Sequence, residues 1–106
     1  MSNVKFSRHA RQRLSRRSNL PLEDVEDIIR YNLCVIVGFE QIKKFSSRKI
    51  HKLFWSIPDE NWFVIIQDEL TGVVITILPP RRSCWVITYS SMEKAKQLVL
   101  GKELPQ

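Results

Sequence analysis

Five short apolar runs, separated by residues that favour turns, fill most of this 106-residue sequence after residue 32. The runs are rich in valine, isoleucine and aromatic residues, which favour strands, while proline, glycine, asparagine and serine stand between them. Strands joined by such short turns pair antiparallel, because a parallel connection needs a longer crossover. The pattern therefore predicts an antiparallel sheet of four to five strands, at residues 33–39, 49–57, 62–68, 73–78 and 84–89.

Two helices are expected before the sheet. Ser7 is a favoured N-cap, so a first helix should begin there. It would bury a narrow strip, because Phe6, Ala10 and Leu14 recur every four residues. A second helix is expected over residues 21–32, since a proline suits a first turn and apolar residues recur through the segment.

A third helix is expected after the sheet. Ser90 followed by Glu93 forms a capping box, and Gly101 is a plausible C-cap. With 43% apolar residues the chain can bury a core, in which the three tryptophans are expected, Trp62 being the most exposed of them. The sequence thus predicts one α+β domain over residues 1–106, with two N-terminal helices packed on a four- to five-stranded antiparallel sheet and a short C-terminal helix.

The charge of the chain favours an anionic partner. The net charge is +6 and the isoelectric point about 9.7. Basic residues crowd residues 5–17, whereas acids crowd residues 23–27. This balance favours partners that carry phosphate groups.

The location of the protein is predicted from what the sequence lacks. No apolar run approaches the roughly 20 residues of a membrane-spanning helix, and the first residues do not resemble a signal peptide. Cys34 and Cys84 stand in apolar runs, which predicts buried thiols in a reducing compartment, with a disulfide between neighbouring strands as the alternative. We expect a cytoplasmic protein that does not contact membranes, whose oligomeric state the sequence leaves open.

The predicted first helix carries an unusual concentration of arginines. His9, Arg13 and Arg17 recur every four residues and form a polar strip beside the apolar one. Like charges at this spacing repel by roughly 0.2–0.5 kcal/mol per pair, so they do not stabilise a helix by themselves. The simplest reason to keep them is an anionic partner, either nucleic acid or an acidic protein segment. The remaining arginines fan out on the rest of the helix: Arg8, Arg11 and Arg16.

The sequence contains no phosphate-binding loop, dinucleotide fingerprint or zinc-ligand spacing, so we expect neither a metal nor a cofactor. The remaining histidine, arginine and hydroxyl side chains suit RNA cleavage through the 2′-hydroxyl. That reaction needs a proton acceptor, a proton donor and cations that stabilise the phosphorane. His9 could exchange the proton, while Arg13 and Arg17 hold the phosphate.

Further candidates for RNA contact lie on and after the predicted strands. His51 lies within a strand, where a half-buried structural histidine is the favoured interpretation and contact with RNA the other. Arg81 and Arg82 follow two prolines in a basic loop, which could equally be a solvated loop. Tyr89 could stack on a base or belong to the core.

The pattern His9-Ala10-x-x-Arg13-Leu14-x-x-Arg17 resembles the opening of a family of small bacterial and phage domains, many of unknown function. These domains are grouped with the RelE/ParE toxins and the wider barnase–EndoU–colicin–RelE class of metal-independent ribonucleases. A later strand of the family commonly ends in an Ile-Thr-hydrophobic pattern before proline, to which residues 75–79 are similar. The resemblance covers roughly residues 4–90.

The resemblance implies a RelE-like domain with an RNA site where the helices meet the rim of the sheet. Carried over by position, His9, Arg13 and Thr76 are the catalytic candidates, and Arg17 binds RNA. The predicted function is therefore a metal-independent, toxin-type endoribonuclease. Its expected partners are RNA and, as for toxins of this type, a cognate acidic antitoxin. The alternative is a non-catalytic protein that binds nucleic acid, or inhibits, through the same basic face.

Overall fold

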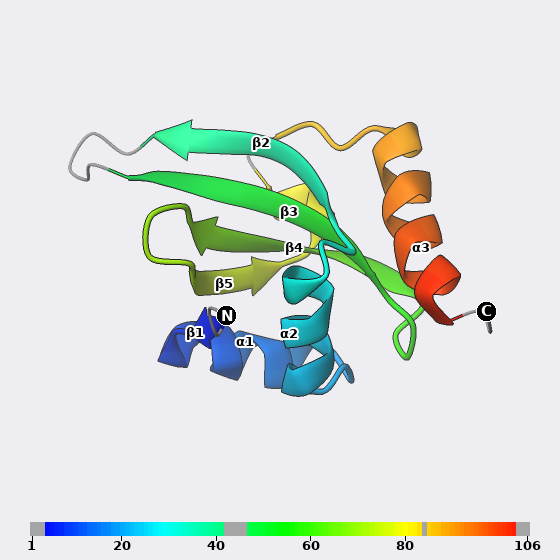
Figure 1. Cartoon of the computed structure of the whole chain (residues 1–106), viewed down its shortest axis with the longest axis horizontal. Helices are drawn as coiled ribbons and strands as arrows, with labels where there is room; N and C mark the ends of the chain where they lie inside the picture. The colour runs from blue at the N-terminus through cyan, green and yellow to red at the C-terminus, as the bar shows by residue number, and fades with distance from the viewer. Residues whose placement is uncertain (1–3, 42–46, 84, 104–106) are drawn as a thin grey trace.

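The computed structural model describes residues 4–41, 47–83 and 85–103, and it has the predicted α+β architecture (Figure 1). Three α-helices and a five-stranded sheet make up the described residues. The elements in chain order are β1 (Lys5–Phe6), α1 (Arg8–Arg17), α2 (Leu22–Arg30), β2 (Val35–Gln41), β3 (Arg48–Ser56), β4 (Asn61–Asp68), β5 (Val73–Leu78), the 3₁₀ turn η1 (Pro80–Arg82) and α3 (Tyr89–Glu103).

The strands lie in the order β1-β5-β4-β3-β2. The four strands β2 to β5 pair antiparallel, as the short turns predict. The fifth strand is the two-residue β1, which pairs parallel with β5 and places Lys5 opposite Val73. A register shift between Ile36 and Gly38 interrupts β2, where a glycine is well tolerated.

The strand predicted at residues 84–89 is wrong. Residues 85–88 have no regular structure, Val86 is 89% exposed, and Tyr89 already belongs to α3. The outer edge of β5 is occupied by β1 and by Ser7, whose backbone N–H donates to the Val74 carbonyl at 2.9 Å. An apolar run therefore did not become a strand, because another segment holds the neighbouring edge. Cys84 lies outside the described residues.

The predicted boundaries of the third helix are also wrong. Thr88 caps α3, since its hydroxyl accepts the Ser91 backbone N–H at 3.1 Å, so the helix begins before the predicted cap at Ser90. The helix continues through Gly101 to Glu103 and is the longest among the described helices.

The first two helices follow their predicted patterns. The Ser7 hydroxyl accepts the Ala10 backbone N–H at 3.0 Å and so caps α1, and both Ala10 and Leu14 are buried. The second helix is shorter than predicted. It ends at Arg30, because Asn32 takes a left-handed backbone conformation with φ of 55°.

The sheet has an apolar core on each face. On one face Phe54, Ile65 and Ile77 pack with the buried residues of α1 and α2. On the other face Leu53 and Val64 pack with Ala95 of α3. Paired residues of neighbouring strands share a face, so Leu53 and Val64 point to one side of the sheet and Phe54 and Phe63 to the other.

Asp59, in the turn between β3 and β4, connects this turn to the segment between α1 and α2. Its carboxylate accepts hydrogen bonds from the Ser18 hydroxyl, from the Ser56 hydroxyl at 2.7 Å, and from the backbone and side-chain N–H groups of Asn19. Partial desolvation raises the pKa of Asp59, but these hydrogen bonds outweigh it and hold that pKa below its usual value. The contact joins residues about forty positions apart.

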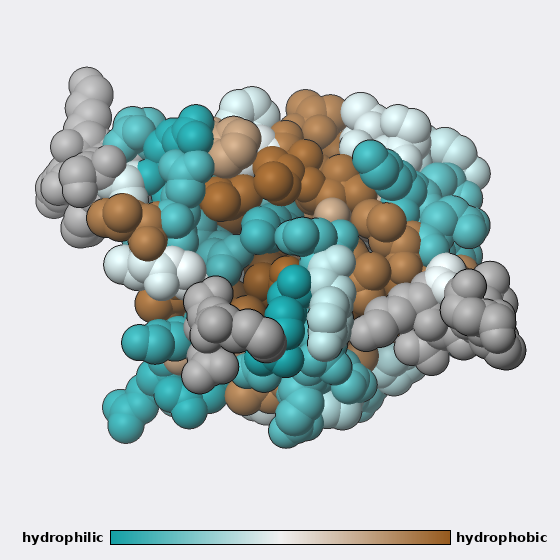
Figure 2. Space-filling model, in the orientation of Figure 1, coloured by the Kyte–Doolittle hydropathy of each residue, from teal (hydrophilic) through white to brown (hydrophobic). Residues whose placement is uncertain are grey.

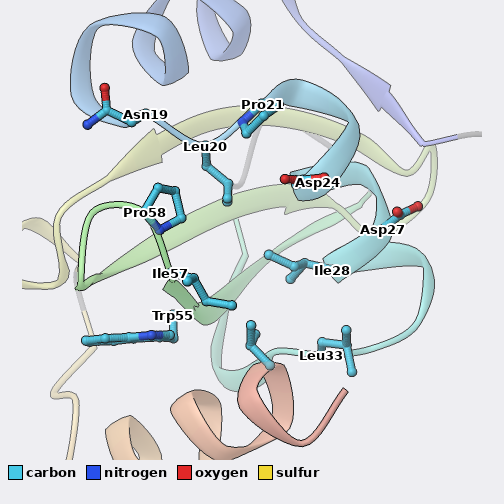
Figure 3. A pocket seen from close by; sticks show the side chains of 11 residues that line it. Asn19, Leu20, Pro21, Asp24, Asp27, Ile28, Leu33, Trp55, Ile57 and Pro58 are labelled. Atoms are coloured by element: carbon cyan, nitrogen blue, oxygen red, sulfur yellow. The ribbon is translucent and has the colours of Figure 1, made fainter. Parts of the chain in front are cut away.

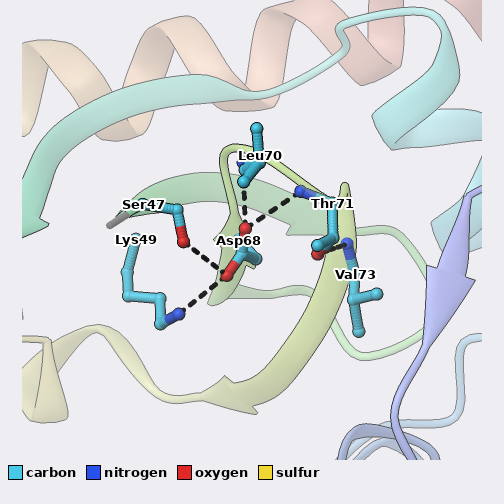
Figure 4. Close-up of polar contacts among 6 residues, drawn as sticks. All are labelled: Ser47, Lys49, Asp68, Leu70, Thr71 and Val73. Atoms are coloured by element: carbon cyan, nitrogen blue, oxygen red, sulfur yellow. Dashed lines mark hydrogen bonds and ion pairs between the residues drawn. The ribbon is translucent and has the colours of Figure 1, made fainter. Parts of the chain in front are cut away.

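A second carboxylate closes the turn between β4 and β5 (Figure 4). Asp68 accepts hydrogen bonds from the Lys49 ammonium at 2.8 Å, from the Ser47 hydroxyl, and from the backbone N–H groups of Leu70 and Thr71. The bond from Lys49, followed by the backbone bonds, lowers the pKa of Asp68 well below its usual range. Asp68 therefore has a structural role, because these bonds hold the turn and join it to β3.

Candidate nucleic-acid interface

Both ends of α1 are attached to the edge of β5. The Ser7 hydroxyl donates to the Ile75 carbonyl at 2.8 Å, and the Arg17 guanidinium donates to the Ile77 carbonyl at 2.7 Å. These are carbonyls that the short β1 leaves without a strand partner. These two bonds hold α1 along the rim of the sheet, with the polar strip on that helix.

His9 and Arg13 lie on this strip as neighbours. His9 is exposed, and the Arg13 Nε–H donates to its Nε2 at 3.3 Å. This contact requires a lone pair on Nε2, so the ring bound in this way is neutral and carries its proton on Nδ1. The imidazole is therefore open to a ligand and is not enclosed in the core.

Arg17 belongs to a group of four arginines from distant parts of the chain. Partial burial, followed by the positive charges of Arg13, Arg82 and Arg81, lowers the pKa of Arg17. Arg17, Arg81 and Arg82 also line an open hollow of about 340 Å³, together with Asn61, Phe63 and Pro79. We call Arg13, Arg17, Arg81 and Arg82 the arginine cluster.

The loop that presents two of these arginines is rigid for local reasons. Pro80 begins the 3₁₀ turn η1, where its missing N–H is not needed and its fixed φ suits the turn. The Arg82 backbone N–H donates to the Pro79 carbonyl at 3.0 Å, and the Ser83 N–H to the Pro80 carbonyl at 3.1 Å. The exposed Arg81 and Arg82 side chains therefore extend from an ordered backbone.

The arginine cluster has no carboxylate partner within the ranges that the structure describes. The ion pairs found there involve Arg30, Arg48, Lys49 and His51. The acids of α2 thus do not neutralise the arginines of α1, although the two helices follow each other in the chain. A concentration of guanidinium groups is left available to an anion from outside.

The other predicted RNA-binding residues are not part of the cluster. Arg8 is exposed at the start of α1, and Arg11 lines a separate hollow with Lys5 and Glu26. Tyr89 is 79% exposed at the start of α3 and lines none of the hollows described here. The predicted RNA-binding residues are therefore spread over different surfaces, which the spacing in the sequence could not show.

His51 is buried, with 1% of its surface exposed, so its ring cannot touch an RNA bound at the surface. Its Nδ1 lies 3.1 Å from the Ser83 hydroxyl, and its Nε2 lies 3.1 Å from a Glu40 carboxylate oxygen. This is a structural role, which the sequence favoured over contact with RNA. The histidine connects β2, β3 and the loop that follows η1.

Thr76 lies on the opposite face of the sheet from the core that α1 covers. Thr76 pairs with Ile66, which pairs with His51, so these three side chains share a face. In the described part of the chain Thr76 shares neither a hydrogen bond nor one of these hollows with His9 or Arg13. The structure thus brings Arg13 together with Arg17, but it does not join Thr76 to them.

A further hollow of about 380 Å³ lies between α2, the end of β3 and α3 (Figure 3). Its floor is apolar and includes Ile28, Trp55 and Val99. Asp24 and Asp27 line one side, so the hollow would repel a phosphate group. This hollow is therefore separate from the surface lined by the arginine cluster.

Sequence reasoning missed Trp85. The three tryptophans were expected in the core, with Trp62 the most exposed, but Trp55 is buried, Trp62 is half-buried and Trp85 is 40% exposed. The adjoining Pro-Pro-Arg-Arg segment was the available signal, because it places this tryptophan beside a presented basic loop.

The described residues were compared with the requirements of a metal site and of a membrane-spanning helix. In those ranges no three histidine, cysteine, aspartate or glutamate side chains gather in a way that could hold a metal ion. Cys34 is a free, partly buried thiol, and burial raises its pKa. Within the same ranges, none of the helices has the length and apolar character required to span a bilayer.

The fold and site together define an α+β protein with an arginine-lined surface at the rim of its sheet. Comparison of the chain with protein-family models, with curated proteins and with solved structures gives no match.

Proposed function

We propose that the protein binds RNA through the arginine cluster. The observation that carries this proposal is that Arg17, Arg81 and Arg82 line one open hollow, with Arg13 near enough for its charge to act on Arg17 and with no carboxylate partner in the described residues. Guanidinium groups bind phosphate oxygens in a fork, and their charge is kept at every physiological pH. The resemblance of the first helix to ribonuclease-like domains supports RNA over an acidic protein segment.

Binding of a labelled single-stranded RNA should depend steeply on salt. Three to four arginine–phosphate contacts predict a slope of log K against log salt of about −2 to −3. Affinity should then fall roughly 20- to 50-fold between about 50 and about 200 mM salt. A fluorescence anisotropy titration at both concentrations measures this. Absence of binding at the lower concentration would remove the proposal, and it would leave docking on an acidic protein as the explanation of the cluster.

A second candidate function is metal-independent RNA cleavage at the same surface. The observation that favours it is the exposed imidazole of His9, which Arg13 contacts through Nε2. In this candidate function His9 exchanges a proton with the 2′-hydroxyl or with the leaving 5′-oxygen, and Arg13 and Arg17 stabilise the charge of the phosphorane. The part assigned to Thr76 rests on the resemblance alone.

Incubation of the protein with total RNA in EDTA tests this second function. If His9 acts in proton transfer, His9→Ala should reduce the cleavage rate by about 100-fold or more. Arg30→Gln is the matched control, because Arg30 is ion-paired with Glu26 on α2 and does not belong to the cluster. Cleavage by neither wild type nor variant would refute catalysis, and equal cleavage by both would remove His9 from it.

A further inference from the structure

We propose that the exposed face of Trp85 is a seat on which one base of the RNA stacks, so that the RNA recognised is single-stranded. The inference rests on the proposed function, because the arginine cluster would hold the phosphates beside this seat. It adds a base-recognition site and a substrate class. A single strand is implied because a base can reach an aromatic face only when it is unstacked from its neighbours.

The indole of Trp85 lies directly on the backbone of β2. A β-carbon at Gly38 would lie 2.2 Å from the indole ring, closer than any real contact, so this approach requires glycine. One side of the ring is thus occupied by the strand. Trp85 nevertheless keeps 40% of its surface exposed.

The segment before Trp85 is held in place by hydrogen bonds. The Trp85 backbone N–H donates to the Ser83 hydroxyl oxygen at 3.2 Å, and the same oxygen lies 3.1 Å from Nδ1 of the buried His51. The other ring nitrogen of His51 contacts Glu40 of β2. His51 is therefore a positioning residue, which acts on RNA only through the loop that it holds.

Trp85 lines a hollow of about 410 Å³, which is within the size range of small-molecule sites. Its lining is mostly apolar and includes Val86, Ile87 and Met92. Figure 2 shows apolar side chains gathered at the top of the view, over β2 and the segment leading to α3, and mostly hydrophilic side chains over α1 at the bottom. A flat base can pack on these apolar side chains, while Arg81 and Ser83 supply polar groups at the same hollow.

Arg81 connects this hollow to the arginine cluster. It lines the hollow of Trp85 and also the hollow that contains Arg17 and Arg82. One guanidinium group thus stands between a surface suited to phosphates and a surface suited to a base. Aromatic side chains beside basic grooves are the usual means of binding single-stranded nucleic acid.

The test compares Trp85→Ala and the matched variant Trp85→Phe against single-stranded RNA and inorganic polyphosphate. Polyphosphate carries the charges of RNA but has no bases. Trp85→Ala should weaken binding of single-stranded RNA by roughly 5- to 100-fold and leave polyphosphate binding unchanged, while Trp85→Phe should retain most of the RNA affinity. Gly38→Val, which displaces the indole without removing it, should weaken RNA binding in the same way.

The possible outcomes distinguish failure of base stacking on Trp85 from failure of phosphate binding by the arginine cluster. Equal RNA binding by wild type and Trp85→Ala, in a sample whose circular dichroism is unchanged, would overturn the seat and leave the arginine cluster intact. Parallel loss of RNA and polyphosphate binding would also overturn it, because the tryptophan would then act only by holding Arg81. Absence of binding of both ligands to the wild type would refute the proposed function itself.

Discussion

Replacing Arg13, Arg81 and Arg82 together by glutamine is expected to weaken binding of single-stranded RNA by roughly 50- to 100-fold near physiological salt. These three members of the arginine cluster donate no described hydrogen bond to the sheet, so their replacement should leave the fold intact. Arg17 is left unchanged, because it donates to the Ile77 carbonyl at the rim of the sheet. The slope of log K against log salt should become less negative by about 2, as three phosphate contacts are lost.

The matched control replaces Arg8, Arg11 and Arg16 by glutamine. It also removes three positive charges, but all of them from α1 and from side chains outside the cluster. Its effect should be several-fold smaller, because long-range attraction between exposed charges is screened within about 10 Å. Similar losses in both triple variants, measured by anisotropy at two salt concentrations, would show that the whole basic surface attracts RNA without a defined site.

Asp59→Ala is expected to lower the free energy of unfolding by about 2–4 kcal/mol at pH 7. The change removes a charged acceptor and leaves the Ser18, Ser56 and Asn19 donors to find water, and such bonds contribute roughly 1.5–3 kcal/mol when one partner is ionised. Urea unfolding followed by circular dichroism measures the difference. Asp24→Ala is the control, because Asp24 is an exposed acid in the first turn of α2 and should contribute less than about 1 kcal/mol.

The stabilisation by Asp59 should also depend on pH in a defined direction. Its pKa in the folded protein is lowered, so its contribution is fully present above the unfolded pKa, near 4, and is lost as the pH falls through the lower, folded value. The difference between wild type and Asp59→Ala should therefore shrink below about pH 4. A difference that stays constant down to pH 2 would show that the carboxylate does not act through its charge.

Much of the candidate site was named from the sequence. The spacing of Arg13 and Arg17 on one helix strip and the basic loop with Arg81 and Arg82 were both visible in the sequence. Their grouping around one hollow was not, because residues about sixty positions apart meet only when α1 attaches to the edge of β5. The same lack of long-range information left His51 among the RNA contacts, although it is buried beneath the loop of Ser83.

The errors at the end of the chain have a similar origin. The apolar run from residue 84 has the composition of a strand, and composition reports only the preferences of neighbouring residues. Whether a run becomes a strand depends on a free edge, and at β5 that edge is taken by β1 and Ser7. Trp85 therefore lies on Gly38 of another strand with 40% of its surface exposed, instead of packing into the core.

The sequence by itself determined the features that depend on near neighbours: the helix capped by Ser7, the strands between their turns, the α+β class and the basic opening segment. Periodicity, caps and turn residues act within a few positions, so they can be read along the chain. The tertiary structure alone decided which arginines face one another, which histidine is enclosed and which tryptophan is open. Those outcomes depend on which of several distant segments occupies a strand edge or a place in the core. A local sequence pattern does not contain that information.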